Sequence, residues 1–210
     1  QGSERRACMF YGLDVHKEFI QVCQLDAKAA NRKEYRIGGS AEEIDRWAPA
    51  GSFILEQHPN HPDYLIAEME TSRGCAYRCS FCTEPLYGNP DFRSVDSIVR
   101  EVDALSDHGV RHFRLGRQAD ILAFGGDGEA PNPDALRSLY GGIRTAAPDL
   151  ETLHLDNMNP VTIVEYPERS RECLEIIAAH NPAGDTAAFG LESADPVVQE
   201  QNNLLVTADE

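Results

Sequence analysis

The spacing of apolar positions divides the chain into two parts with different predicted elements. In the first part, apolar and polar residues alternate on both sides of a polar turn, which predicts a hairpin over Phe10–Leu25 and a third strand over Lys33–Ile37. A short helix over Ala41–Trp47 follows, and Pro49 is expected to end it. Residues 1–50 are therefore predicted to form a small β-hairpin and helix segment.

Beyond residue 50, short apolar runs alternate with stretches of helical periodicity. Strands are predicted over residues 64–69, 110–115, 150–155 and 186–191, and helices over 94–108, 133–147, 168–180 and from 196 onward. Repeated strand–helix units predict a parallel sheet with right-handed crossovers. The expected fold class is α/β, with the working residues at the carboxyl ends of the strands, as in β/α barrels.

Three cysteines stand directly after the first of these strands. Cys75, Cys79 and Cys82 have the spacing C-x3-C-x2-C, and the aromatic Phe81 precedes the last of them. Thiolates are soft ligands suited to iron–sulfur clusters or to zinc. Three thiolates can hold three irons of a cubane cluster and leave the fourth iron open for a substrate or cofactor. The spacing predicts a metal centre, and the alternative to a catalytic cluster is a non-catalytic cysteine-cluster module that binds zinc.

The run from Glu70 to Pro85, with its C-x3-C-x-aromatic-C spacing after a strand, resembles the radical S-adenosylmethionine (SAM) enzymes, in particular their archaeal Fe-S oxidoreductase branch. The resemblance implies that the three cysteines ligate a [4Fe-4S] cluster whose open iron binds SAM. One electron from the cluster would cleave SAM to methionine and a 5′-deoxyadenosyl radical, which acts on a substrate that the sequence does not name. A low-potential electron donor of the ferredoxin or flavodoxin type is also implied.

This resemblance also implies a partial TIM-type β/α barrel over residues 51–210. The predicted barrel is incomplete, so an open edge would expose cluster and radical to water and oxygen. We therefore expect this chain to hold a cluster weakly and to turn over SAM slowly or not at all.

Candidate SAM-binding residues follow from the same resemblance at three strand ends. The second strand ends where the family carries a Gly-Gly-Glu-type element, although here one glycine is followed by Arg-Gln. The third ends in a polar run, and the fourth resembles the glycine–hydrophobic–Glu–Ser element expected near the ribose or amino group of SAM. The candidates are Gly116, Gln118, Asp156, Glu192 and Ser193.

The N-terminal segment carries a second resemblance. Gly12–Asp26 resembles the opening of RuvC-like transposases with an Asp-Glu-Asp-Asp site, which implies that Asp14 is a Mg²⁺ ligand and makes Glu56 a candidate for the second acid. Such sites need several carboxylates around two metal ions, and the later aspartates do not follow. We expect residues 1–50 to be an RNase-H-like fragment, foreign or fused, before a truncated radical SAM core over 51–210. An inactive transposase fragment is the alternative.

Charge is distributed unevenly along the chain. The formal net charge is −16, and residues 51–210 hold eleven Arg, no Lys and 27 acidic residues. An acidic, lysine-free segment predicts adaptation to high salt, with ordinary acidic solubility as the alternative, and it disfavours nucleic acid as a partner. Three of the six cysteines lie in one loop, and no signal peptide or long apolar span is visible. These features predict a cytoplasmic protein without a membrane segment.

Overall fold

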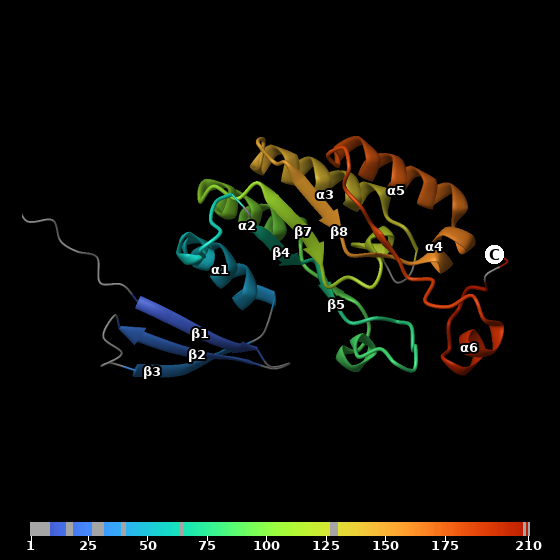
Figure 1. Cartoon of the computed structure of the whole chain (residues 1–210), viewed down its shortest axis with the longest axis horizontal. Helices are drawn as coiled ribbons and strands as arrows, with labels where there is room; N and C mark the ends of the chain where they lie inside the picture. Colours follow the sequence, from blue (N-terminus) through green and yellow to red (C-terminus); the bar gives the residue numbers. More distant parts are fainter. Residues whose placement is uncertain are drawn as a thin grey trace, which may run out of the picture. The chain divides into compact units, whose positions relative to one another are not determined.

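The computed structural model describes residues 9–15, 19–26, 32–38, 41–63, 65–126, 130–207 and 209. Its internal contacts divide the chain into two compact units, Gln1–Ala48 and Pro49–Glu210. The predicted boundary at residue 50 lies close to this division. The elements of both units are labelled in Figure 1.

The first unit contains an antiparallel sheet of three strands. Its strands β1 (Met9–Val15), β2 (Phe19–Asp26) and β3 (Arg32–Gly38) pair in the order β1-β2-β3. The predicted hairpin and third strand are therefore confirmed. Asp14 lies in β1, but its side chain lies outside the described part of the chain, so its predicted metal role stays a prediction.

Helix α1 (Ala41–Gly51) begins where it was predicted but continues past Pro49. The expectation that Pro49 ends this helix was wrong. A proline removes one backbone N–H donor from a helix, and here less than one turn follows it. The chain then tightens into a 3₁₀ helix, η1 (Ser52–Gln57), in which the Ser52 hydroxyl donates to the carbonyl of Pro49 at 2.8 Å.

The second unit is built on a parallel sheet. Strands β4 (Ile66–Glu70), β7 (His112–Gly116) and β8 (Thr152–Leu155) pair in the order β4-β7-β8. Just beyond β8, the short strand β9 (Asn157–Met158) pairs in parallel with β10 (Ala188–Phe189). This confirms a mixed α/β fold with a parallel sheet, and closure of that sheet into a partial barrel stays a prediction.

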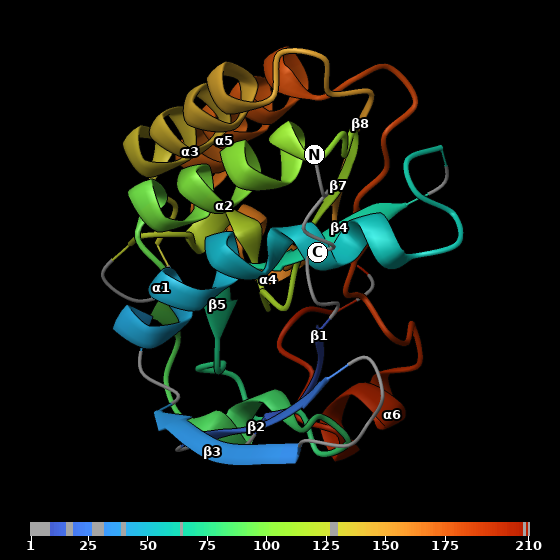
Figure 2. The same cartoon turned by 90° about the vertical axis from the view of Figure 1, so that its left-hand side faces the viewer.

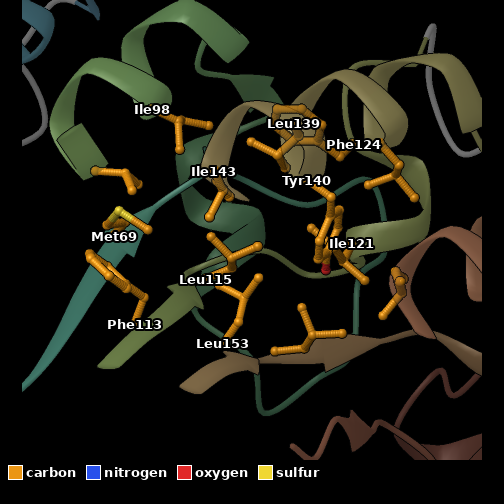
Figure 3. Close-up of a cluster of buried hydrophobic side chains, with 14 of the residues drawn as sticks. Met69, Ile98, Phe113, Leu115, Ile121, Phe124, Leu139, Tyr140, Ile143 and Leu153 are labelled. Atoms are coloured by element: carbon orange, nitrogen blue, oxygen red, sulfur yellow. The ribbon is translucent and has the colours of Figure 1, made fainter. Parts of the chain in front are cut away.

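Helices α2 (Val95–Asp107) and α3 (Pro133–Ala146) connect successive strands of this sheet, and α5 (Pro167–His180) precedes β10 in the chain. They lie side by side on one face of the sheet, as Figures 1 and 2 show. The strands alternate between buried side chains facing these helices and more exposed ones on the opposite face. The labelled core in Figure 3 consists of Met69, Ile98, Phe113, Leu115, Ile121, Phe124, Leu139, Tyr140, Ile143 and Leu153.

Several short elements in the second unit were not predicted. The predicted strand over 186–191 is reduced to the two residues of β10, and a helix, α4 (Pro160–Glu165), follows β9. Helix α6 (Pro196–Gln201) begins at the predicted residue. Also unpredicted are η1 and β9, together with β5 (Ser72–Arg73), β6 (Asp91–Phe92), η2 (Glu84–Tyr87) and η3 (Ile121–Ala123).

Candidate functional site

The loop that carries the three cysteines is fastened at its base to the carboxyl ends of β4 and β7. Strands β5 and β6 pair antiparallel across this base. The amide of Thr71 donates to the carbonyl of Gly116 at 3.2 Å, and the amide of Arg93 donates to the carbonyl of Thr71 at 3.0 Å. The Arg93 guanidinium is buried and donates to Glu101 at 2.6 Å, which joins the loop base to α2. These bonds hold the cysteine loop at the strand ends where a functional site was expected.

The three thiols influence one another electrostatically. Burial raises the pKa of the Cys75 thiol, and negative charge on Cys82 or Cys79 raises it further. Burial also raises the pKa of the Cys79 thiol, again with a contribution from Cys82. Neighbouring thiolates repel one another, and bound metal cations remove that repulsion. The three cysteines therefore form a donor set that fits a soft metal.

The cysteine loop forms one wall of a pocket of about 300 Å³, a volume at the lower end of small-molecule sites. The ends of β7, β9 and β10 and the segment after α6 supply the other walls. The wall is mainly apolar, with charged groups near the thiols. Its apolar lining includes Tyr77, Met158, Val161, Leu191, Leu204 and Val206, and its charged lining consists of Glu84, Arg117, Asp156 and Glu192.

Asp156 enters the pocket from the turn between β8 and β9. One of its oxygens forms an ion pair with the Arg114 guanidinium, and the other accepts from the amide of Arg117 at 3.2 Å. Arg117 has a positive φ of 57°, and its guanidinium donates to Glu84 at 3.2 Å. The Arg117 guanidinium is thus engaged in an ion pair with another residue of the pocket lining. Asp156 therefore fixes the backbone of the pocket wall at Arg117.

Gly116 and Gln118 stand at the end of β7, but their polar groups bond within the protein. The amide group of Gln118 donates to the carbonyl of Leu115 at 2.8 Å and accepts from the Thr71 hydroxyl at 3.1 Å. Gln118 is only 2% exposed although it borders the pocket. Gly116 does not line the pocket, and a Cβ there would lie 2.6 Å from the Glu68 carboxylate. Both residues hold the base of the cysteine loop, and a direct role of either in ligand binding stays a prediction.

Glu192 and Ser193 follow β10 on the opposite wall. Glu192 is exposed, has a positive φ of 62° and lines the pocket. A non-glycine residue in this backbone region is uncommon and is often found at functional sites. Ser193 lies outside the lining, and its hydroxyl accepts from the amide of Asp195 at 3.1 Å. The structure thus places the carboxylate of Glu192, but not the hydroxyl of Ser193, at the pocket.

Asp120 is a buried carboxylate that joins two of the pocket walls. It follows β7 and accepts from the amide of Asn159 at 3.2 Å and from the hydroxyl of Thr162 at 2.5 Å. Burial raises the pKa of its carboxyl group above the usual value of 3.8, and the bond from Thr162 partly opposes this. Sequence reasoning did not single out Asp120 because a lone aspartate after a strand has no distinguishing pattern.

Glu56, the candidate second acid of the transposase resemblance, forms a contact with a histidine. Glu56 lies in η1, and its carboxylate is 2.6 Å from Nδ1 of His108.

Among the described residues, no helix is long and apolar enough to cross a membrane.

Residues 69–207 match the family model of the radical SAM superfamily. This range includes the cysteine loop and all residues that line the pocket. A protein of Archaeoglobus fulgidus described as uncharacterized is 40% identical over 197 residues, which cover 92% of this chain and 37% of the relative. An uncharacterized protein of Methanocaldococcus jannaschii is 39% identical over 180 residues, which cover 80% and 33% respectively.

The chain thus spans about a third of the length of these archaeal relatives. The Archaeoglobus alignment covers so much of the chain that it includes most of residues 1–50. A ribosomal protein uS12 methylthiotransferase RimO from a Synechococcus strain is 31% identical over 113 residues, which cover 44% of this chain and 24% of that protein.

Proposed function

Because the chain belongs to the radical SAM superfamily, we propose that it binds a [4Fe-4S] cluster through Cys75, Cys79 and Cys82 and cleaves SAM reductively. One observation carries the proposal: three thiols on one loop open into a pocket that also presents Asp156 and Glu192. Carboxylates attract the positive sulfonium and ammonium groups of SAM, and apolar walls suit its adenine. When bound, the cluster supplies the electron that cleaves SAM to methionine and a 5′-deoxyadenosyl radical.

The donor set supports a cluster over a single zinc ion. A structural zinc site generally has four protein ligands, whereas the cysteine loop supplies three thiols to the pocket. A cubane cluster makes a different demand, because each cysteine thiolate bonds a separate iron. Three thiols therefore suffice to hold three irons and leave the fourth open, and all three line the same pocket.

The pocket residues divide into ligands and supports. We assign Glu192 to the positive groups or ribose of SAM, because it lines the pocket and is exposed. Asp156 presents a second carboxylate, although Arg114 already compensates part of its charge. Gly116, Gln118 and Ser193 act as supports in this proposal, since the polar groups of these strand ends bond to other parts of the protein.

The reaction is proposed only as a class. The superfamily includes the RimO methylthiotransferases. No residue described above determines the substrate of this chain, or whether it acts as an oxidoreductase or a transferase. A ferredoxin- or flavodoxin-type donor, a partial barrel and a reducing cytoplasmic setting belong to the same proposal, since a reduced iron–sulfur site needs both an electron source and free thiols.

The first test is anaerobic reconstitution with iron and sulfide, followed by electron paramagnetic resonance (EPR) of the reduced protein. We expect a [4Fe-4S]⁺ signal that is lost in Cys79→Ala and retained in Cys173→Ala. Cys173 is a matched control because it is a free cysteine buried in α5 outside the pocket. A colourless wild-type protein that binds one zinc ion instead would overturn the proposal.

The second test concerns SAM. Adding SAM to the reduced protein should shift the EPR signal, and Glu192→Gln should raise the SAM concentration needed for half of that shift by about tenfold, which equals ~1.4 kcal/mol. Glu200→Gln is the control, because Glu200 is an exposed acid of α6 that does not line the pocket. Equal effects of both substitutions would remove Glu192 from the SAM site.

A further inference from the structure

Cys79 differs from the other two cysteines in what holds it. The amide of Cys75 donates to Gly88 within the same loop, and the amide of Cys82 donates to the carbonyl of Cys79 at 3.1 Å. The position of Cys82 therefore depends on that of Cys79. The neighbours of Cys79 are fastened from outside the loop, by a turn more than a hundred residues later in the sequence.

That turn consists of Asn202 and Asn203, directly after α6. The amide of Ser80 donates to the carbonyl of Asn202 at 3.1 Å, and the Ser80 hydroxyl lies 2.5 Å from Oδ1 of Asn202. On the other side of Cys79, the side-chain amide of Asn203 donates to the carbonyl of Arg78 at 3.2 Å. One turn thus holds the residue before Cys79 and the residue after it.

The turn is itself fixed by its surroundings. The amide and side-chain Nδ2 of Asn202 both donate to the carbonyl of Val198, at 3.1 and 2.9 Å. Asn203 has a positive φ of 54°, a conformation that asparagine tolerates better than most residues. The buried amide of Gln199 donates to the carbonyls of Ser193 at 2.7 Å and Val206 at 3.1 Å. These bonds tie the turn to the segment that begins beside Glu192.

The same segment packs against the cysteines and lines the pocket. Val206 forms a small apolar cluster with Tyr77 and Val161, against which Cys75 and Cys79 pack. Leu204, Leu205 and Val206 belong to the pocket wall. The segment 193–206 therefore contacts the cysteine loop on one side and the pocket on the other.

We propose that the Asn202–Asn203 turn is the positioning element for Cys79, and that it sets the geometry in which the three thiols meet a cluster. This inference rests on the proposed function for the identity of the bound group. Its structural half, namely that the turn holds Cys79 in place, concerns the protein alone. Ligands of a metal site must be held to within about 0.5 Å by the groups around them. Without the turn, the residues on both sides of Cys79 lose these hydrogen bonds, and Cys82, whose amide donates to Cys79, is less well positioned as well.

The structural half is tested by amide hydrogen exchange of the metal-free chain. Asn203→Gly removes the side-chain donor and keeps a residue that tolerates positive φ, while Ser80→Ala removes the hydroxyl contact and leaves the turn intact. We expect exchange in the peptide containing Cys79 to increase about fivefold in Asn203→Gly, the change expected when one ordinary hydrogen bond is lost, and to increase less in Ser80→Ala.

Asn181→Ala is the matched control for these variants. Its side-chain amide also donates to a distant carbonyl, that of Leu153 at 2.9 Å, but far from the cysteine loop in sequence. It should loosen its own surroundings and leave the cysteine peptide unchanged. If the cysteine peptide exchanges at the wild-type rate in both Asn203→Gly and Ser80→Ala, the turn is not an anchor and the inference fails.

The second readout is the rate at which a chelator removes iron from reconstituted protein. We expect Asn203→Gly to lose iron at least several times faster than Asn181→Ala, and its reduced EPR signal to broaden, although the two variants unfold at similar temperatures. Equal rates of iron loss in the two variants would mean that Asn203 has only a structural role. If the wild-type chain takes up no cluster, the proposed function fails, and hydrogen exchange alone decides whether the turn holds Cys79.

Discussion

Gly74 shows at the level of one residue how tightly the cysteine loop is folded. Its φ is 88°, and a Cβ at this position would lie 2.6 Å from the carbonyl oxygen of Asn89 and 2.7 Å from that of Gly88. Both obstacles are backbone atoms of the returning arm of the loop, so neither can move aside as a side chain would. A glycine directly before Cys75 is therefore required by space as well as by backbone conformation.

Gly74→Ala should destabilise the second unit by about 2–4 kcal/mol, combining left-handed strain of ~1–2 kcal/mol with the backbone clash. Gly184→Ala is the control, because Gly184 has a φ of 95° but open space around its Cβ position. It should cost only the strain of ~1–2 kcal/mol. Urea unfolding of both variants measures the difference, and equal losses of stability would show that the clash with residues 88 and 89 is relieved.

Asp120 provides a prediction for pH dependence. Its pKa is raised in the folded protein, mainly by burial, so the folded state binds this proton more tightly than the unfolded state. The contribution of this group to stability is therefore present at acidic pH and is lost as pH rises from 3.8 through the raised value.

Asp120→Asn should remove the fall in stability with rising pH, because the amide does not titrate. The hydrogen bonds are kept, because Oδ1 can still accept from Leu122 and Asn159 and the Thr162 hydroxyl can turn to accept from the new amide. Urea unfolding across acidic to neutral pH should show that the free energy of unfolding of the variant increases relative to that of the wild type as pH rises. Asp120→Ala, which leaves buried amides unpaired, should cost ~1–3 kcal/mol. A constant difference between Asp120→Asn and wild type at all pH values would refute the assignment.

At the scale of elements, the packing of α2 against α3 depends on one glycine of an adjacent pair. A Cβ on Gly142 would lie 2.5 Å from Cγ2 of Val99, whereas a Cβ on Gly141 would meet nothing within 4 Å. From the sequence alone, such a pair is only a weak point in a helix, because glycine is a poor helix former. The structure shows that Gly142 allows the close approach of the two helices.

Gly142→Ala should therefore destabilise the protein by ~1–3 kcal/mol through overpacking. Gly141→Ala should stabilise it by up to ~1 kcal/mol, since alanine favours the helix more than glycine does. The two variants differ only in which neighbouring position carries the methyl group, so thermal unfolding compares them directly. Changes of the same sign would argue against the close contact at Val99.

The long helices could be predicted because their signals are local. Ser94 caps α2 through its side chain, which accepts from the amide of Ser97, and the predicted apolar positions Ile98, Val102 and Leu105 are buried. Helix α4 has only six residues, too few for a periodic pattern to emerge.

The cysteine spacing and the strand ends likewise located one end of the candidate site. On the opposite wall Glu192 was among the candidates, but the part formed by Leu204 to Val206 and the bonds from the Asn202–Asn203 turn depend on contacts between distant residues. Such contacts leave no local pattern in a single sequence, so neither could be read from it. The same limit explains why Gln118, chosen as a SAM ligand from the resemblance of the second strand end to the family's Gly-Gly-Glu-type element, has its amide bonded to Leu115 and Thr71.

For the whole molecule, net charge is the property that most affects behaviour in solution. With a formal charge of −16, the folded chain repels itself, and some carboxylates lie where they are least favourable. Asp107 is exposed at the C-terminal end of α2, where the helix dipole disfavours negative charge, and Asp103 is exposed one turn before it. Glu175 is a further exposed acid, on α5.

The melting temperature should therefore rise with potassium chloride concentration, because the screening length falls to ~3 Å at about 1 M salt. A triple variant, Asp103→Asn, Asp107→Asn and Glu175→Gln, should melt higher than wild type at low salt and gain less from added salt. Sucrose at matched osmolality separates screening from general exclusion effects. A melting temperature that does not change with salt, or an equal salt response in both proteins, would contradict this account and the high-salt adaptation with it.

The distance along the chain between the cysteine loop and the turn that holds it has a consequence for biosynthesis. Ser80 and Asn202 are separated by 122 positions, so a growing polypeptide exposes all three cysteines long before the ribosome adds the residues that fasten them. Until those residues are added, the thiols can react with oxidants or bind metal ions before the loop is held in place. If the chain holds the proposed cluster, iron–sulfur assembly factors are therefore expected to find a competent acceptor only after synthesis has passed Val206.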